Sequence, residues 1–143
     1  MSVAASAAPY VGLDASLPML LEAERQENLV TGDALHLPFR DATFEAVVAC
    51  RLLHHLGSSE ERRGVLAEFA RVSRRLLIGS FWDAASWHAL RRRLGWREDT
   101  STRRAIRKRQ LVDDLEAAGL RVLAWKHSFR FVSQQTFFVA EKR

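Results

Sequence analysis

The sequence predicts an α/β domain built on a mostly parallel sheet with helices on both faces. Short apolar runs alternate with amphipathic helical stretches along most of the chain, which is the pattern of strands joined by helices. The last two apolar runs follow each other with no helical pattern between them, so we expect these two strands to pair antiparallel. With 143 residues, the chain has the length of one domain.

Six segments are predicted as strands because apolar and β-branched residues are bounded there by turn-forming ones. They are Tyr10–Leu13, Leu29–Thr31, Glu45–Cys50, Leu76–Phe81, Arg121–Phe129 and Gln135–Arg143. The third, EAVVAC, is nearly continuous in apolar residues, as expected of a strand buried on both faces. We expect Cys50 to be a small apolar residue of that strand.

Capping signals place the first and last predicted helices. Ser16 is a favourable N-cap and Pro18 falls in the first turn of a helix that should end near Gln26. The stretch RQLVDDLEAAGL (Arg109–Leu120) predicts a helix closed by Gly119 at the C′ position.

The middle helix is predicted from a capping box. Ser58 and Glu61 match the S-x-x-E pattern in which each side chain satisfies a free backbone N–H. The helix should run from about residue 60 to 74 and bury one stripe at i, i+4 and i+7. The stripe is Val65, Phe69 and Val72.

Basic residues gather in the region 83–110, which we predict to be a basic helical insert or lid. The net charge is +5, and nine basic residues lie in LRRRLGWRE (Leu90–Glu98) and RRAIRKRQ (Arg103–Gln110). Such a run is usually a solvated helix face, with Trp87, Leu90 and Leu94 as its apolar side. The alternatives are docking of an acidic partner, RNA or an anionic membrane surface.

Two acidic residues follow the first two predicted strands. Asp14 comes after the first strand, and Asp33 follows the second strand 19 residues later. A carboxylate at a strand end can accept hydrogen bonds from both hydroxyls of a ribose, and one on the neighbouring strand can reach the amine of an adenine. An isolated aspartate here would more often form a cap or a turn. The pair, in this order and spacing, favours a nucleoside site.

These stretches together resemble a known family. YVGLDASLPML (Tyr10–Leu20) and VTGDALHLPFRDATFEAVVACRLLHHL (Val30–Leu56) resemble the class I S-adenosylmethionine-dependent methyltransferases, in the type 11-like group of small-molecule enzymes with a GDA-x-x-LPF … FD-x-V signature. The likeness extends from about Tyr10 to the end, where SQQTFFVAEK resembles the last strand of bacterial members. Glu45 stands where the family commonly has Asp. The resemblance implies a Rossmann-like methyltransferase sheet with an antiparallel C-terminal strand.

The resemblance also implies roles at the first two strand ends. Asp14 would bind the ribose hydroxyls of S-adenosyl-L-methionine, and Ala15 would lie against the adenine. Asp33 would accept a hydrogen bond from the adenine amine, and the backbone N–H of Ala34 would donate to the ring. Met19 could pack near the adenine, although a core position is the favoured interpretation.

Further roles are implied after the third strand. Arg51 would line the methionine end of the cofactor, and His54 and His55 would lie near the substrate mouth. Either histidine is a candidate general base, because imidazole titrates near neutral pH. A lone loop histidine is more often a surface or packing residue, so no catalytic residue is assigned.

The family's first strand and its glycine-rich loop have no counterpart in this sequence. The loop should lie roughly 20 residues before the acidic residue, yet 13 residues precede Asp14 and no G-x-G occurs. The chain would then be one incomplete methyltransferase domain, residues 1–143. Met1 could be internal to a longer enzyme, the gene could be a decayed fragment, or the chain could be a retained binding module. If nothing precedes Met1, the strand of Asp14 should pair directly with Glu45–Cys50.

The implied function is methyl transfer from S-adenosylmethionine to a small molecule, with activity lost where the glycine-rich loop is missing. The alternative is a non-catalytic remnant or module that docks an acidic partner or RNA through its basic helix. A nucleic-acid acceptor is not expected, and the acceptor atom and oligomeric state stay open. Five histidines and one cysteine lack metal-ligand spacing, so no metal is expected. The single cysteine and the lack of any apolar run of ~18 residues favour a cytoplasmic protein without a transmembrane segment.

Overall fold

A computed structural model describes residues 9–22, 28–85, 104–127 and 135–143. The chain divides into two compact units, residues 1–38 and 39–143. The described strands form two sheets, one of two strands in the first unit and one of four strands in the second. The mixed α/β architecture, with parallel strand pairs in both sheets and an antiparallel C-terminal strand, agrees with the predicted fold class.

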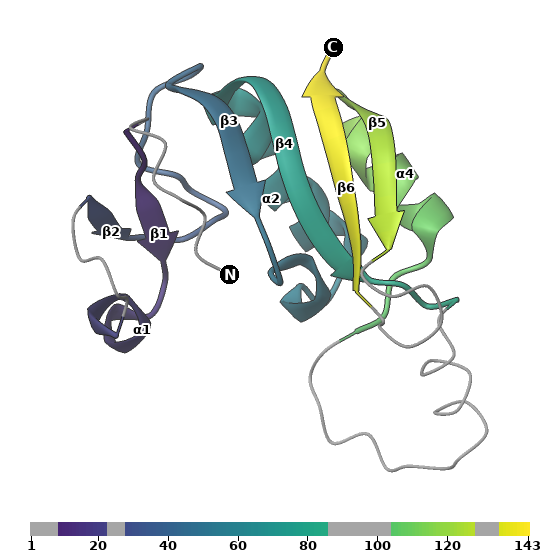
Figure 1. Ribbon diagram of the computed structural model, residues 1–143, viewed down its shortest axis with the longest axis horizontal. Helices are drawn as coiled ribbons and strands as arrows, with labels where there is room; N and C mark the ends of the chain where they lie inside the picture. Colours follow the sequence, from purple (N-terminus) through teal and green to yellow (C-terminus); the bar gives the residue numbers. More distant parts are fainter. Residues whose placement is uncertain (1–8, 23–27, 86–103, 128–134) are drawn as a thin grey trace. The chain divides into compact units, whose positions relative to one another are not determined.

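The first unit consists of β1 (Gly12–Asp14), α1 (Leu17–Leu21) and β2 (Leu29–Thr31). The two strands are parallel, and their register pairs Asp14 with Thr31. Figure 1 shows the short helix on the connection between them. Pro18 lies in the first turn, as predicted, whereas the Ser16 side chain makes no capping hydrogen bond.

Helix α1 buries a different residue from the one expected. Leu20 is its buried side chain, whereas Met19 is 59 % exposed. The favoured interpretation of Met19 as a core residue is therefore wrong, because successive positions of a helix face different directions and Leu20 takes the inward one. The predicted continuation toward Gln26 lies outside the described residues.

The second unit contains β3 (Phe44–Ala49), η1 (Leu53–His55), α2 (Ser59–Val72), β4 (Ser73–Trp82), α4 (Lys108–Ala117), β5 (Leu120–His127) and β6 (Gln135–Lys142). The strand order is β3-β4-β6-β5. Strands β3 and β4 are parallel, and β6 runs antiparallel to both of its neighbours. The predicted antiparallel pairing of the last two strands is confirmed, with β6 inside the sheet and β5 at its edge.

The predicted pairing of the strand of Asp14 with Glu45–Cys50 joins residues of two different units and stays a prediction. Within the units, β1 pairs with β2 and β3 pairs with β4. The choice of strand partner is set by contacts between distant segments, and the local apolar pattern that identified both strands carries no information on it.

Among the described residues of the second unit, helices α2 and α4 cover one face of the four-stranded sheet (Figure 1). Most of the basic helical region predicted over 83–110 lies outside the described residues. The core under α2 and α4 is apolar and almost fully excluded from solvent. Its largest buried side chains include Leu66, Leu77, Phe81, Leu111, Leu115, Leu120 and Phe138. The predicted α2 stripe is confirmed, because Val65, Phe69 and Val72 are all buried. Burial of each such side chain stabilises the fold by about 1.5–3 kcal/mol.

The predicted helix caps of this unit form as expected. The Ser58 hydroxyl accepts from the Glu61 N–H at 3.1 Å, and the Glu61 carboxylate accepts from the Gly57 N–H at 2.7 Å. The Glu61 side chain thus accepts from the N–H of Gly57, the residue before the N-cap, and not from the N–H of Ser58 itself. Gly119 follows the end of α4 with φ of +75°, the left-handed conformation that closes helices.

A buried ion cluster fastens α2 to α4. The Asp114 carboxylate is fully buried and accepts from Arg62 Nε at 2.9 Å and from Arg63 Nε at 2.8 Å. Arg62 is itself 4 % exposed and also donates to the Ser59 hydroxyl at 2.7 Å. Each carboxylate oxygen therefore has a charged donor, which a buried carboxylate requires.

The connector before β3 is held by one arginine of α2. Arg71 pairs with Glu68 and Asp41 and donates to the Phe39 carbonyl at 2.7 Å. These two carboxylates, Glu68 first, raise the pKa of Arg71 above its ordinary value. The Phe39 ring packs edge-on against Phe44, with ring centroids 4.9 Å apart. Phe39, the last residue of the LPF signature segment, is thereby held within the second unit.

Candidate functional site

The acidic residues of the first unit lie at adjacent strand ends. Asp14 is the last residue of β1 and is exposed, and its carbonyl accepts from the Gly32 N–H at 3.1 Å. Asp33 follows that glycine and is 61 % exposed. Because the carboxyl ends of parallel strands meet at one sheet edge, both carboxylates stand where such sheets bind ligands.

Each carboxylate also forms a local turn. Asp14 Oδ1 accepts from the Ser16 N–H at 2.8 Å, and Asp33 Oδ1 accepts from the Leu35 N–H at 2.9 Å. His36 Nδ1 lies 3.6 Å from Asp33 Oδ2. The bonds from the Ser16 and Leu35 N–H groups are those of an Asx turn. Each of these two bonds uses one of about four acceptor positions on its carboxylate, so both carboxylates can accept further donors from a ligand.

The two alanines occupy the turns that follow. Ala15 is exposed between Asp14 and the start of α1, and Ala34 is half-buried in the turn after β2. Both therefore lie at the same edge as the carboxylates. Four of the five expected cofactor-binding residues belong to this unit, and Arg51 belongs to the second.

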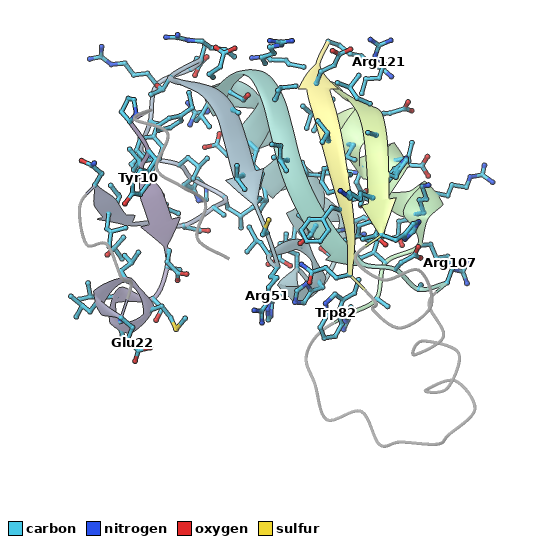
Figure 2. All side chains as sticks on the ribbon, viewed as in Figure 1. Tyr10, Glu22, Arg51, Trp82, Arg107 and Arg121 are labelled. Atoms are coloured by element: carbon cyan, nitrogen blue, oxygen red, sulfur yellow. The ribbon has the colours of Figure 1, made fainter. Side chains whose placement is uncertain are left out.

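The chain turns sharply after β3. Arg51 has φ of +63°, in the left-handed region that non-glycine residues seldom adopt. Its N–H donates to the Ser80 hydroxyl at 2.9 Å, and its side chain is exposed (Figure 2). Cys50 is also exposed, so its expected place as a buried strand residue is wrong: β3 ends at Ala49, and Cys50 already belongs to the turn.

The two histidines of η1 differ in environment. His54 is 2 % exposed, and its ring stacks on Trp82 with centroids 4.5 Å apart and planes 11° apart. The exposed His55 ring lies 4.4 Å from the His54 ring. Burial in a ring stack is a packing arrangement, so His55 is the histidine that a substrate could reach.

A segment far along the chain completes this edge of the second unit. The Arg104 N–H donates to the His54 carbonyl at 2.8 Å, and its guanidinium donates to the Gly57 carbonyl at 2.9 Å. The Ile106 N–H donates to the Trp82 carbonyl at 2.8 Å. No local pattern in the sequence predicts the contact with Arg104, because it joins residues that are far apart along the chain. Most of the predicted insert or lid, residues 86–103, lies outside the described residues.

Two other kinds of site were sought across the described ranges. No group of three or more His, Cys, Asp or Glu residues there could hold a metal ion. Within those same ranges, no helix has the length and apolar character needed to cross a membrane.

Several solved structures on which this chain superposes are named methyltransferases. A SAM-dependent methyltransferase from Methanosarcina mazei superposes with a TM-score of 0.71 and 16 % identity, covering 92 % of this chain and 81 % of that one. The magnesium protoporphyrin IX methyltransferase of Synechocystis with bound S-adenosylmethionine gives 0.65 and 18 %, covering 93 % and 59 %. A protein from Pyrococcus horikoshii gives 0.75 and 20 %, covering 93 % and 71 %. The fold is the Rossmann-like methyltransferase fold.

Sequence comparison defines the family. Residues 1–76 match the model described as a methyltransferase domain. The chain belongs to the class I S-adenosylmethionine-dependent methyltransferases. An Encephalitozoon cuniculi protein provisionally named a methyltransferase is 38 % identical over 64 residues, which are 43 % of this chain and 30 % of that protein. The tRNA (carboxymethyluridine(34)-5-O)-methyltransferase of Arabidopsis thaliana is 28 % identical over 64 residues, 44 % of this chain and 16 % of that protein. The match thus spans less than a third of either relative.

Proposed function

We propose that this chain serves methyl transfer from S-adenosylmethionine to a small-molecule acceptor. The observation that carries the proposal is the pair of exposed carboxylates, Asp14 and Asp33, at the ends of adjacent parallel strands in a chain of this family. The cofactor, when bound, supplies a methyl group activated by a positively charged sulfur. In-line displacement of that group depends mainly on positioning the donor and the acceptor.

The chemistry of the first unit fits the nucleoside part of the cofactor. Asp14 would accept from the ribose hydroxyls and Asp33 from the adenine amine, since both carboxylates keep acceptor capacity beyond their turn bonds. Ala15 offers a small exposed surface to the adenine. The N–H of Ala34 would donate to a ring nitrogen.

The second unit would serve the reacting end. Arg51 would line the methionine part, where its guanidinium can pair with a carboxylate. His55, the exposed histidine of η1, would face the acceptor and could take up a proton if the acceptor must lose one. His54 would support His55 through the tilted contact between their rings.

The proposal is tested by titrating the whole chain with S-adenosylhomocysteine and following backbone amides by NMR. Binding should shift the amides of residues 12–15 and 33–34 at millimolar ligand, with weak affinity because the sequence has no G-x-G. Asp14→Asn and Asp33→Asn should each weaken binding about tenfold or more, as expected for losing a hydrogen bond to a charged acceptor. Asp113→Asn, at an exposed position of α4, is the matched control. Absence of any shift in the wild-type chain would refute cofactor binding by this polypeptide.

A second candidate function is docking of RNA or another acidic partner through the basic residues of 87–108. The Arabidopsis relative named as a tRNA methyltransferase favours testing it. Two described residues of this run are already engaged: Arg104 with the Gly57 carbonyl, and Lys108 with its ammonium 4.3 Å above the Trp125 ring. Phosphate-driven binding predicts an RNA affinity that falls steeply with salt, and an affinity insensitive to salt would exclude it.

A further inference from the structure

Ser80 is a polar residue at a buried strand position, where an apolar residue would be expected. It lies in β4 and is fully buried. Its hydroxyl accepts from the Arg51 N–H at 2.9 Å and from the Gln135 side-chain amide at 3.1 Å. One oxygen atom thus connects the turn after β3, the strand β4 and the start of β6.

The Arg51 bond acts on a strained backbone. Left-handed φ values are disfavoured for residues with a Cβ atom and persist only where the surroundings impose them. The hydrogen bond from the Arg51 N–H to a buried oxygen is such a constraint, because losing it would leave a backbone donor without its acceptor.

The segment that follows Arg51 is held at its other end by the same strand. Three residues lie between Arg51 and His55, and one of them, His54, stacks on Trp82. Ser80 and Trp82 are alternate residues of β4, so they face the same side of the sheet. β4 therefore fixes the start of the turn through a hydrogen bond and its end through a ring stack.

We propose that Ser80 is a positioning residue for the substrate end of the site. Its hydroxyl holds Arg51 in the left-handed conformation and so sets the direction of η1 and of the exposed His55 ring. The inference rests on the proposed function only for the roles of Arg51 in cofactor binding and of His55 at the acceptor. The positioning itself is a property of the second unit.

The test compares Ser80→Ala with Ser73→Ala in the whole chain. Ser73 is a matched control, because it is also buried, lies at the other end of β4 and bonds through its hydroxyl to the Leu76 carbonyl. NMR would report the hydrogen exchange and the φ-sensitive HN–Hα coupling of Arg51, and the Hε1 resonance of His55. Ser80→Ala should accelerate Arg51 exchange about tenfold or more, because amide protection follows the native hydrogen bond. It should also change the coupling and shift the His55 resonance.

Several outcomes separate positioning from general destabilisation. Ser80→Cys, of similar volume but with a weak acceptor, should give intermediate changes and serves if Ser80→Ala does not fold. Unchanged Arg51 and His55 signals in both Ser80 variants, or equal changes in Ser73→Ala, would overturn the proposal. An S-adenosylhomocysteine titration that shifts no amide would defeat the proposed function and leave the Ser80 result standing.

Discussion

Removal of the buried carboxylate between α2 and α4 should be severely destabilising. Asp114→Ala takes away the acceptor of two guanidiniums, one of which, Arg62, is 4 % exposed and cannot regain water without moving the helices. Breaking a buried pair by deleting one partner costs about 3–5 kcal/mol. A domain of this size has a total stability of about 5–15 kcal/mol, so the variant should lose about a fifth of it or more.

The measurement is urea unfolding followed by circular dichroism and tryptophan fluorescence, with coincident transitions required before free energies are compared. Asp113→Ala is the control, because the neighbouring carboxylate is exposed on the same helix and should change the free energy of unfolding by about 0.5 kcal/mol at most. A loss below about 1 kcal/mol for Asp114→Ala would refute the reasoning.

The double variant Arg62→Leu with Asp114→Leu distinguishes an unpaired charge from lost packing. Replacing both partners of a buried pair with apolar side chains is often neutral. The double variant should therefore be more stable than Asp114→Ala, with a coupling free energy of about 2 kcal/mol. If the double variant lost as much free energy of unfolding as the two single variants combined, the charges of Arg62 and Asp114 would not stabilise each other.

Three further changes probe local features of the second unit. Ser58→Ala removes the hydroxyl that accepts from the Glu61 N–H and should cost about 1 kcal/mol in urea unfolding, and no loss would mean the cap is dispensable. Gly79→Ala would drive a Cβ atom into the Phe138 ring and should lower the free energy of unfolding by about 1–3 kcal/mol. Adding Phe138→Leu should recover part of this loss. An unchanged thermal midpoint for Gly79→Ala would show that the ring moves freely. Gly119→Ala forces a side chain into φ of +75° and should cost about 1 kcal/mol by calorimetry, whereas a stabilised variant would contradict the left-handed cap.

The strands and helices were largely predictable because their signals are local. The run Glu45–Cys50 forms β3, but Ala49 is its one buried residue, so the expected burial on both faces is wrong; the stripe Val65, Phe69 and Val72 forms and is buried. Met19 was misplaced because the helical pattern does not say which of two adjacent apolar residues turns inward. The pairing of β1 was not predictable either, since partner choice depends on contacts between distant segments.

The candidate site was predictable in its residue types and less so in their surroundings. The strand-end rule identified Asp14, Asp33 and Arg51, and the structure places Asp14 at the last position of β1, Asp33 two residues after β2 and Arg51 two residues after β3. The sequence could not show that His54 is buried against Trp82, because adjacent histidines have identical local signals. The roles of these residues in binding and catalysis stay predictions.

The position of β6 inside the sheet has a consequence for the order of assembly during synthesis. The ribosome releases β4 and β5 before β6. In the described part of the sheet, β4 and β5 do not pair with each other, and each forms its hydrogen-bonded ladder with β6. Until residues 135–142 emerge, β5 has no ladder and the edge of β4 is open. Closure of the sheet must therefore wait for the last strand, and a nascent chain stalled before residue 135 should bind chaperones that recognise unpaired strands.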